Sequence, residues 1–294
     1  MIVAVASGKG GTGKTTVSAS LASVWPSPVV AVDLDVEEPN LHLFMNPAIS
    51  TQEPSYIEIP EIDDEKCTRC RACTDICQFK AIGIFGEVVM TFPEMCHGCG
   101  ACWTICPEKA ITPGKRELGQ ILSGQSGPSA FVMGRLRVGE AMSPPLMRDV
   151  KRHLNGSSSY ADRDIIIDAP PGVSCPAINA VMDADVIVLV TEPTPFGLYD
   201  LALAQQAFAP LGKPMGVVIN RADIGTRDVY DHCQKTGLTI LAEIPYQRDI
   251  AEAYAKGQII AAAVPSMQTV FETLVGQIKT LHGQPSMARE VQHA

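Results

Sequence analysis

The chain has 294 residues, of which 46% are hydrophobic, and its formal net charge is −9. This length suffices for one large domain or two smaller domains with a buried core, while an acidic chain without basic runs is poorly suited to non-specific binding of nucleic acid or anionic membranes. An apolar run begins at Ile2, and no stretch approaches the about 18 apolar residues of a spanning helix, so we expect a cytoplasmic protein without signal peptide or direct membrane insertion.

A glycine-rich loop follows the first apolar run. Residues 2–7 predict a buried strand, and the residues from Thr15 onward can form a helix. Glycines let backbone N–H groups converge on an anion, and the N-terminus of a helix adds positive potential. Lys14 is expected to neutralise the β and γ phosphates of a nucleotide, and the Thr15 hydroxyl to hold Mg²⁺; a turn without a ligand is the alternative. The predicted phosphate site comprises Gly8, Lys9, Gly10, Gly11, Thr12, Gly13, Lys14, Thr15 and Thr16.

The lysine directly after the first glycine, Lys9, is the unusual residue of this loop. The arrangement resembles the deviant P-loop of the MinD/ParA ATPases, a superfamily that includes the nitrogenase iron protein. The resemblance implies an ATPase that binds ATP with Mg²⁺ and forms a homodimer with nucleotide at the interface. Lys9 would then reach across to the phosphates of the partner, whereas a solvated loop lysine is the alternative.

Two carboxylates follow the second predicted strand, residues 29–33. Asp33 and Asp35 stand at its C-terminal end, which faces the ligand crevice in a parallel α/β sheet. In MinD-like ATPases a D-x-D at this place is switch I. The resemblance implies that Asp33 holds the water shell of Mg²⁺ and that Asp35 positions or activates the attacking water; a polar strand end is the alternative.

The segment from Asn46 to Asp64 is rich in Pro, Ser and acidic residues, so we expect a domain boundary there. We expect the first part of the ATPase domain at 1–60, an inserted domain at 61–114, the second part of the ATPase domain at 115–283 and a flexible tail at 284–294. The alternation of apolar and small residues over 115–139 predicts a β-hairpin beside the insert.

Two cysteine runs, each of the form C-x2-C-x2-C-x3-C, lie within the expected insert. This is the spacing of bacterial two-cluster ferredoxins, in which the fourth cysteine of each run ligates the other cluster. Zinc is the rival metal, but it takes four ligands and would not require two such runs. We therefore assign one [4Fe–4S] cluster to Cys67, Cys70, Cys73 and Cys106, and the second to Cys96, Cys99, Cys102 and Cys77.

Residues 164–172 return to the nucleotide site. Three isoleucines lead into Asp168, the Walker B position, which should help to hold Mg²⁺, and Gly172 should present its N–H to the γ-phosphate. Cys175 follows in the same segment, at about the offset of a cluster-ligating cysteine in the nitrogenase iron protein. A small buried or helix-capping cysteine is the alternative, and Cys233 is interpreted as a core residue.

The base-binding residues are expected near the end of the chain. Asn220 ends the strand predicted for 217–220 and matches the residue that reads the base in MinD-like ATPases, and Pro245 lies in the loop expected beside the base. However, residues 220–223 also resemble the guanine-reading N-K-x-D of GTPases, with arginine for lysine. The surrounding signature favours adenine.

Together these elements predict a doubly wound, mostly parallel α/β sheet of the P-loop NTPase type with an inserted small α+β ferredoxin-like domain. The first function hypothesis is an iron–sulfur ATPase whose dimerisation and hydrolysis are coupled to electron transfer, or to assembly or delivery of a metal cofactor, for a client protein. The alternative is a MinD-like positioning scaffold of the cell-division kind with structural clusters. A third hypothesis is a ferredoxin with a vestigial nucleotide site.

Overall fold

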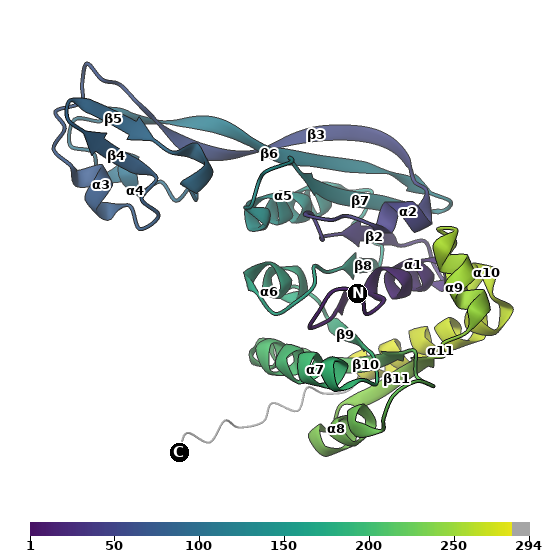
Figure 1. The fold of residues 1–294 in the computed structure, drawn as a ribbon. Coiled ribbons are helices and arrows are strands. Elements are labelled where there is room, and N and C mark those ends of the chain that lie inside the picture. The colour runs from purple at the N-terminus through teal and green to yellow at the C-terminus, as the bar shows by residue number, and fades with distance from the viewer. Residues whose placement is uncertain (284–294) are drawn as a thin grey trace.

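The computed structural model describes residues 1–283, so the tail expected at 284–294 lies outside the described residues. Its centre is a sheet of nine strands in the order β11-β10-β9-β1-β8-β2-β7-β6-β3 (Figure 1). Neighbouring strands are parallel from β11 to β7, and only β6 and β3 are added in antiparallel orientation. The bounds are β1 Ile2–Ala6, β2 Val30–Asp33, β3 Ala48–Ile62, β6 Ile111–Ser126, β7 Ser129–Leu136, β8 Ile165–Asp168, β9 Val186–Thr191, β10 Met215–Asn220 and β11 Thr239–Ile244.

Helices cover both faces of the parallel part of the sheet (Figure 1). Alternate residues of β1 enter different cores: Val3 and Val5 pack on the side of α1 and α11, whereas Ala4 and Ala6 pack on the side of α5 to α8. Because both faces are buried, the central strands are apolar throughout, as predicted. The helices are α1 Lys14–Val24, α2 Leu41–Met45, α5 Ser143–Gly156, α6 Cys175–Val181, α7 Pro195–Phe208, α8 Asp228–Thr236, α9 Arg248–Ala255, α10 Ile260–Ala263 and α11 Pro265–His282, with a 3-10 turn at Ala209–Leu211.

The chain order reverses direction across the sheet at β1. Strand β1 lies between β8 and β9, and β2 lies beyond β8. In open α/β sheets ligands bind outside the carboxyl ends of the strands at such a switch point. The loops that follow β1, β2 and β8 therefore meet at one crevice, and the doubly wound, mostly parallel fold predicted from the sequence is confirmed.

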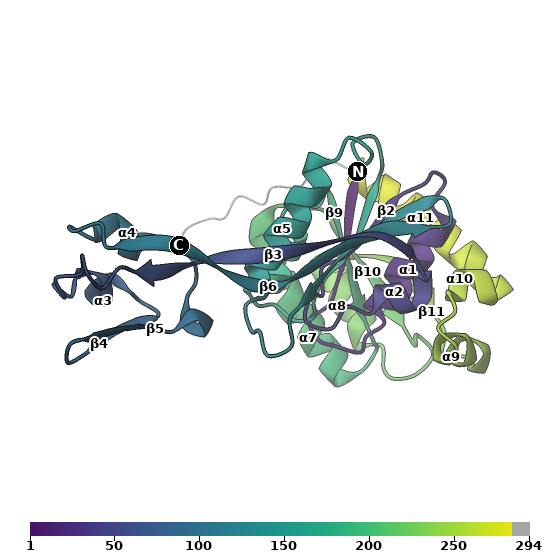
Figure 2. The ribbon, with the colours of Figure 1, turned by 90° about the horizontal axis from the view of Figure 1, so that it is seen from above.

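The segment expected as a boundary, residues 46–64, instead contains the long strand β3. It pairs with β6 in antiparallel register from Ala48 opposite Gln125 to Ile62 opposite Ile111. Pro54 and Pro60 fit because β3 is the edge strand, where one side of the backbone needs no partner. Beyond the end of β7 the two strands leave the sheet as a ribbon (Figures 1 and 2).

A small cysteine-rich unit sits at the far end of this ribbon, and we call residues 63–110 the cysteine domain. Its two runs fold alike: each short helix follows a residue in the left-handed conformation, Arg71 before α3 and Gly100 before α4. Left-handed backbone also recurs at Arg69 and Gly98 and at Lys80 and Lys109. The domain comprises α3 Ala72–Ile76, α4 Ala101–Ile105, the hairpin β4 Ile82–Phe85 and β5 Val88–Thr91, and a 3-10 turn at Pro93–Met95.

The hairpin expected at 115–139 forms from β6 and β7, but β7 is part of the main sheet because it also pairs with β2 in parallel. The final helix, α11, begins at Pro265, and proline is well accommodated in the first helical turn. Within residues 1–283, no helix combines the length and the apolar character required to cross a bilayer.

Candidate nucleotide site and cysteine cavities

The predicted phosphate loop connects β1 to α1, which begins at Lys14. Gly13 precedes the helix with a φ of 100°, a conformation that glycine adopts without strain. Gly8 is required for a different reason, because a Cβ atom there would collide with the carbonyl of Asp200 in α7. The Thr12 side chain is buried, and its hydroxyl has no hydrogen-bond partner within residues 1–283. A buried polar atom at the loop is compatible with an anionic ligand.

Three carboxylates, at the ends of β2 and β8 and just after β2, act electrostatically on Lys14. Asp33 and Asp168 are buried, and Asp33 accepts the N–H groups of Leu41 at 2.9 Å and Asp35 at 3.0 Å. Burial raises the pKa of Asp33, and the charge of Asp168 raises it further. Burial also lowers the pKa of Lys14, although the three carboxylates oppose that shift.

Asp35 and Asp168 complete the group. Burial and the charge of Asp168 raise the pKa of Asp35 to about 6. The pKa of Asp168 is raised by burial, while the hydroxyls of Thr15 and Ser18 and the charge of Lys14 lower it. One lysine cannot balance three close carboxylates, so the site has an excess of negative charge. Carboxylate and hydroxyl oxygens are the ligands of a hard divalent cation, and Thr15, Asp33 and Asp168 therefore fit the predicted Mg²⁺ site.

Ser18 is the residue of this site that sequence analysis missed. Its Oγ lies 3.0 Å from Asp168 Oδ1 and 3.0 Å from the Lys14 carbonyl. Ser18 stands one helical turn after Lys14, and residues four apart share a helix face. That spacing is the signal that could have identified it.

The residues expected to bind the base lie at the rim of the same crevice. Asn220 Nδ2 donates to the Thr12 carbonyl at 2.9 Å, and its Oδ1 accepts the N–H of Arg221 at 2.9 Å. The Asp223 carboxylate accepts the N–H of Tyr246 at 2.5 Å, which fixes the loop that contains Pro245. The structure thus joins Asn220 to the phosphate loop, and base reading by Asn220 and Pro245 stays a prediction.

Gly172 and Lys9 are the two residues of the flanking loops that were expected to contact the phosphates. Gly172 was expected to present its N–H to the γ-phosphate. In this structure that N–H donates to the Ser7 carbonyl at 2.9 Å. Lys9 is partly exposed, and its carbonyl accepts the Ser7 hydroxyl at 2.5 Å. A contact of Lys9 with a partner subunit stays a prediction.

The eight cysteines of the two runs divide between two cavities in the cysteine domain. The first cavity is lined by Cys67, Cys70, Cys73 and Cys106, and the second by Cys77, Cys96, Cys99 and Cys102. These sets are the two that the spacing predicted. No group of three or more His, Cys, Asp or Glu side chains within residues 1–283 is placed to hold a metal ion, so iron–sulfur ligation stays a prediction.

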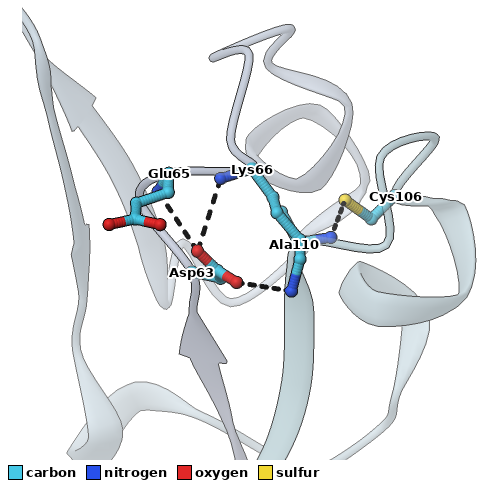
Figure 3. A network of polar contacts seen from close by, with 5 residues as sticks. All are labelled: Asp63, Glu65, Lys66, Cys106 and Ala110. Atoms are coloured by element: carbon cyan, nitrogen blue, oxygen red, sulfur yellow. Dashed lines mark hydrogen bonds and ion pairs between the residues drawn. The ribbon is translucent and has the colours of Figure 1, made fainter.

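Backbone amides donate to sulfur in the same way in both runs. Ala81 N lies 3.3 Å from Cys77 Sγ, and Ala110 N lies 3.3 Å from Cys106 Sγ. Asp63 also binds Ala110, through a backbone hydrogen bond of 2.8 Å, and its carboxylate accepts the N–H of Lys66 (Figure 3). The entry and exit of the domain are thereby tied together beside the first cavity.

Burial raises the pKa of the Cys102 thiol to about 11 and also raises the pKa of the Cys73 and Cys96 thiols. Thiolates in these positions therefore need a cationic partner. The two remaining cysteines are remote from the cavities. Cys175 is exposed at the start of α6, so it is not a buried cysteine but does lie at a helix terminus, whereas Cys233 is buried in α8 as expected.

Residues 3–260 match the model of the CobQ/CobB/MinD/ParA nucleotide binding domain. An uncharacterized protein of Methanocaldococcus jannaschii is 42% identical over 203 residues, which cover 68% of this chain and 70% of that protein. An uncharacterized ATP-binding protein of the same organism is 26% identical over 264 residues, which cover 87% of this chain and 78% of that protein.

Among solved structures, the septum site-determining protein MinD of Pyrococcus horikoshii, complexed with Mg-ADP, has a similar fold. It superposes with a TM-score of 0.61 at 22% identity and covers 96% of this chain and 97% of its own. The cell division ATPase MinD of Pyrococcus furiosus gives a TM-score of 0.59 at 22% identity, with 95% and 98% covered.

Proposed function

Since this chain belongs to the CobQ/CobB/MinD/ParA nucleotide-binding family, we propose that it is a Mg²⁺-dependent ATPase whose nucleotide site acts together with iron–sulfur clusters in the cysteine domain. The observation that carries the ATPase part is the group of three carboxylates around buried Lys14 at the mouth of the phosphate loop. Its charge and donor set suit a nucleotide with a divalent cation.

The roles of the individual residues follow from their positions. Lys14 and the loop amides counter the phosphate charge, which grows on the transferred group during hydrolysis. Thr15, Asp33 and Asp168 supply oxygen ligands to Mg²⁺ or to its water shell. Asp35, whose pKa is about 6, can orient the attacking water and accept its proton near neutral pH. Lys9 is the residue proposed to contact the nucleotide of a second copy in a homodimer.

The cysteine domain is proposed to hold two [4Fe–4S] clusters. What supports this is that each cavity is lined by four cysteines, three from one run and the fourth from the other. Zinc is the rival metal, but it takes four ligands at one ion and would not require two such runs. When bound, such clusters supply one-electron carriers, and N–H···S hydrogen bonds help to set their potentials.

In this proposal the dimer forms with ATP and is reset by hydrolysis, and the cysteine domain serves a redox or metallocofactor client protein. The chain's own connectivity supports the link between the two sites. Strand β2 carries Asp33 at its end, and the chain passes from there through α2 into β3, which leads into the cysteine domain. The segment after β2 therefore lies close in sequence to the ribbon, so a change in that segment on hydrolysis can be passed to the ribbon.

A second candidate is a positioning scaffold of the MinD kind, in which the clusters would only stabilise the insert. The comparisons favour this candidate, because the structural relatives are named as septum-site and cell-division ATPases and the curated relative as an ATP-binding protein. At these identities the structural likeness supports the fold, and the cysteine cavities are the feature that favours redox coupling.

The deciding experiment is anaerobic purification with iron and sulfide counts, followed by ATPase assays with and without dithionite. Redox coupling predicts about eight iron atoms per chain and a rate or dimer affinity that differs between the reduced and oxidised protein. Equal rates and equal dimer affinities in both states would support the scaffold. Protein without iron that hydrolyses ATP normally would remove the iron–sulfur part of the proposal.

A further inference from the structure

Arg116 of β6 is a buried cation at the junction between the ATPase body and the cysteine domain. Its side chain is 8% exposed and pairs with Glu140, which is 3% exposed and lies in the loop between β7 and α5. Only Nη1 of the guanidinium is used in this pair. Nε and Nη2 are buried and have no hydrogen-bond partner within residues 1–283. Most buried donors in proteins are paired, so two unused donors on one buried arginine call for a reason.

The second cysteine cavity lies against the same stretch of ribbon. Arg116 is the register partner of Ile57, and a Cβ atom on Gly98 would meet the Ile57 side chain. The Cys96 sulfur lies 3.9 Å from the carbonyl of Glu58, the next residue of β3. Cys96 and Arg116 are therefore neighbours across one short segment of β3. Burial raises the pKa of the Cys96 thiol, and the positive charge of Arg116 opposes this shift.

Glu140 determines how much of the arginine charge remains uncompensated. Its Oε1 accepts the N–H groups of Ala141 and Met142 at 3.1 Å each, and its Oε2 faces Arg116. Arg137 lies 4.0 Å from the same Oε2 but is about half exposed, so solvent weakens its effect. The loop is also tied to the nucleotide side, because Leu136 N donates to the carbonyl of Val36, the residue after Asp35.

We propose that Arg116 is a positioning residue for the second cysteine set, that it holds a positive charge beside Cys96, and that Glu140 tunes this charge. The inference rests on the proposed function, because it concerns clusters bound at the two cysteine sets. Reduction adds negative charge to a cluster, so a nearby cation favours the reduced form. The first cysteine set lies toward the far end of the ribbon, where Ile62 and Ile111 line its cavity, and is much less affected.

The test is a potentiometric titration of the anaerobic full-length protein, followed by electron paramagnetic resonance. Cys70→Ser, which changes an exposed ligand of the first set, identifies the signal of that centre. Arg116→Gln should lower the reduced-to-oxidised ratio of the second centre about tenfold at fixed potential, which corresponds to about 59 mV for one electron. Glu140→Gln should raise the reduced-to-oxidised ratio of the second centre. Arg116→Lys, which keeps the positive charge, should have a ratio close to that of the wild type.

Shifts of opposite sign in the two variants are the decisive result, because a purely structural pair would move both variants in the same direction. Arg137→Gln is the matched control and should leave both centres unchanged. If Arg116→Gln fails to fold, Glu140→Gln still carries the test, since Arg116 remains in place. Bound clusters whose second potential does not move, or moves in the same direction in both variants, would overturn this inference alone. A wild-type protein that binds no iron would overturn the proposed function and the inference together.

Discussion

The Oγ atom of Ser18 lies 3.0 Å from Oδ1 of Asp168, so the first helix contacts the end of β8 directly beneath the phosphate loop. The contact therefore joins Asp168, the Walker B residue, to Ser18, a position of α1 that belongs to none of the predicted motifs. Thr15 of the same helix also hydrogen-bonds this carboxylate, so both hydroxyls help to hold Asp168 in place.

Ser18→Ala should weaken the response to Mg²⁺. Loss of a buried hydrogen bond to a carboxylate should reduce the free energy of unfolding by about 1–2 kcal/mol, and the Mg²⁺ concentration for half-maximal ATPase activity should increase. Denaturant unfolding and a Mg²⁺ titration measure the two effects. Ser20→Ala is the matched control, since the Ser20 hydroxyl has no partner within residues 1–283 and its removal should cost little.

Lys14→Ala should abolish nucleotide binding or reduce turnover at least about 100-fold, because the phosphates lose their main counter-charge. Equilibrium binding of a fluorescent ATP analogue and a phosphate-release assay would measure this. Lys256→Ala, at an exposed position after α9, should behave like the wild type. Tight binding and normal turnover by the Lys14 variant would refute the phosphate-loop assignment.

Asp35→Ala should retain ATP binding but stop hydrolysis, so that the protein accumulates as an ATP-bound dimer. The reason is that the attacking water loses the carboxylate that orients it, while the phosphate contacts are unaffected. Size-exclusion chromatography with ATP and Mg²⁺ would detect the trapped dimer. Glu37→Ala, an exposed acidic neighbour, is the control; rapid turnover by the Asp35 variant would rule out this role.

Turnover should fall on acidification through the pKa of Asp35, which is about 6. Below that value the carboxyl is protonated and cannot accept a proton from water. The effect on stability has the opposite sign. Because folding raises this pKa above its ordinary 3.8, the group contributes stability that is fully present below 3.8 and is lost as the pH rises to about 6.

A pH–rate profile and unfolding curves across this pH range measure both effects. In Asp35→Asn, the residual ATPase rate should no longer fall on acidification below about pH 6. The free energy of unfolding of the unliganded variant should also lose the decline that the wild type shows as the pH rises to about 6. A wild-type profile that is flat from pH 5 to 7 would contradict the assignment of Asp35 as the titrating group.

Cys73→Ser should remove about half of the bound iron, because it opens one of the two cysteine sets. It should also destabilise the cysteine domain, since cluster binding and folding are linked. Iron analysis, visible absorption and limited proteolysis would measure these effects. Cys175→Ser, at an exposed position outside both cavities, should keep its full iron content; equal iron loss in both variants would contradict the cavity assignment.

The sequence predicted most of what depends on local pattern. The apolar run before Asp168 and the one before Asn220 are buried and form β8 and β10 as expected. Strand β3 was missed because Pro54, Pro60 and its polar residues resemble a linker, and because its pairing partner β6 is distant in sequence. Most of β3 is exposed, so it lacks the apolar alternation by which a half-buried strand is identified.

The candidate sites show the same difference between features with a local sequence pattern and features formed by distant segments. The cysteine sets could be grouped from spacing alone, because a repeated motif carries its own register. The carbonyl that Asn220 contacts and the Arg116–Glu140 pair could not be foreseen, since each joins segments that only the folded chain brings together.

The ribbon of β3 and β6 has a mechanical consequence. Pairing of β6 with β7 ends at Gly119, and from there to Ile111 the two strands continue without a third for roughly 25 Å at about 3.3 Å per residue. An isolated strand pair twists readily. Arg116 in this stretch still pairs with Glu140 of the body, so the ribbon can bend beyond Arg116, and a bend there would displace the cysteine domain (Figure 2). In the proposed homodimer, such a bend would change the distance between the cysteine domains of the two copies.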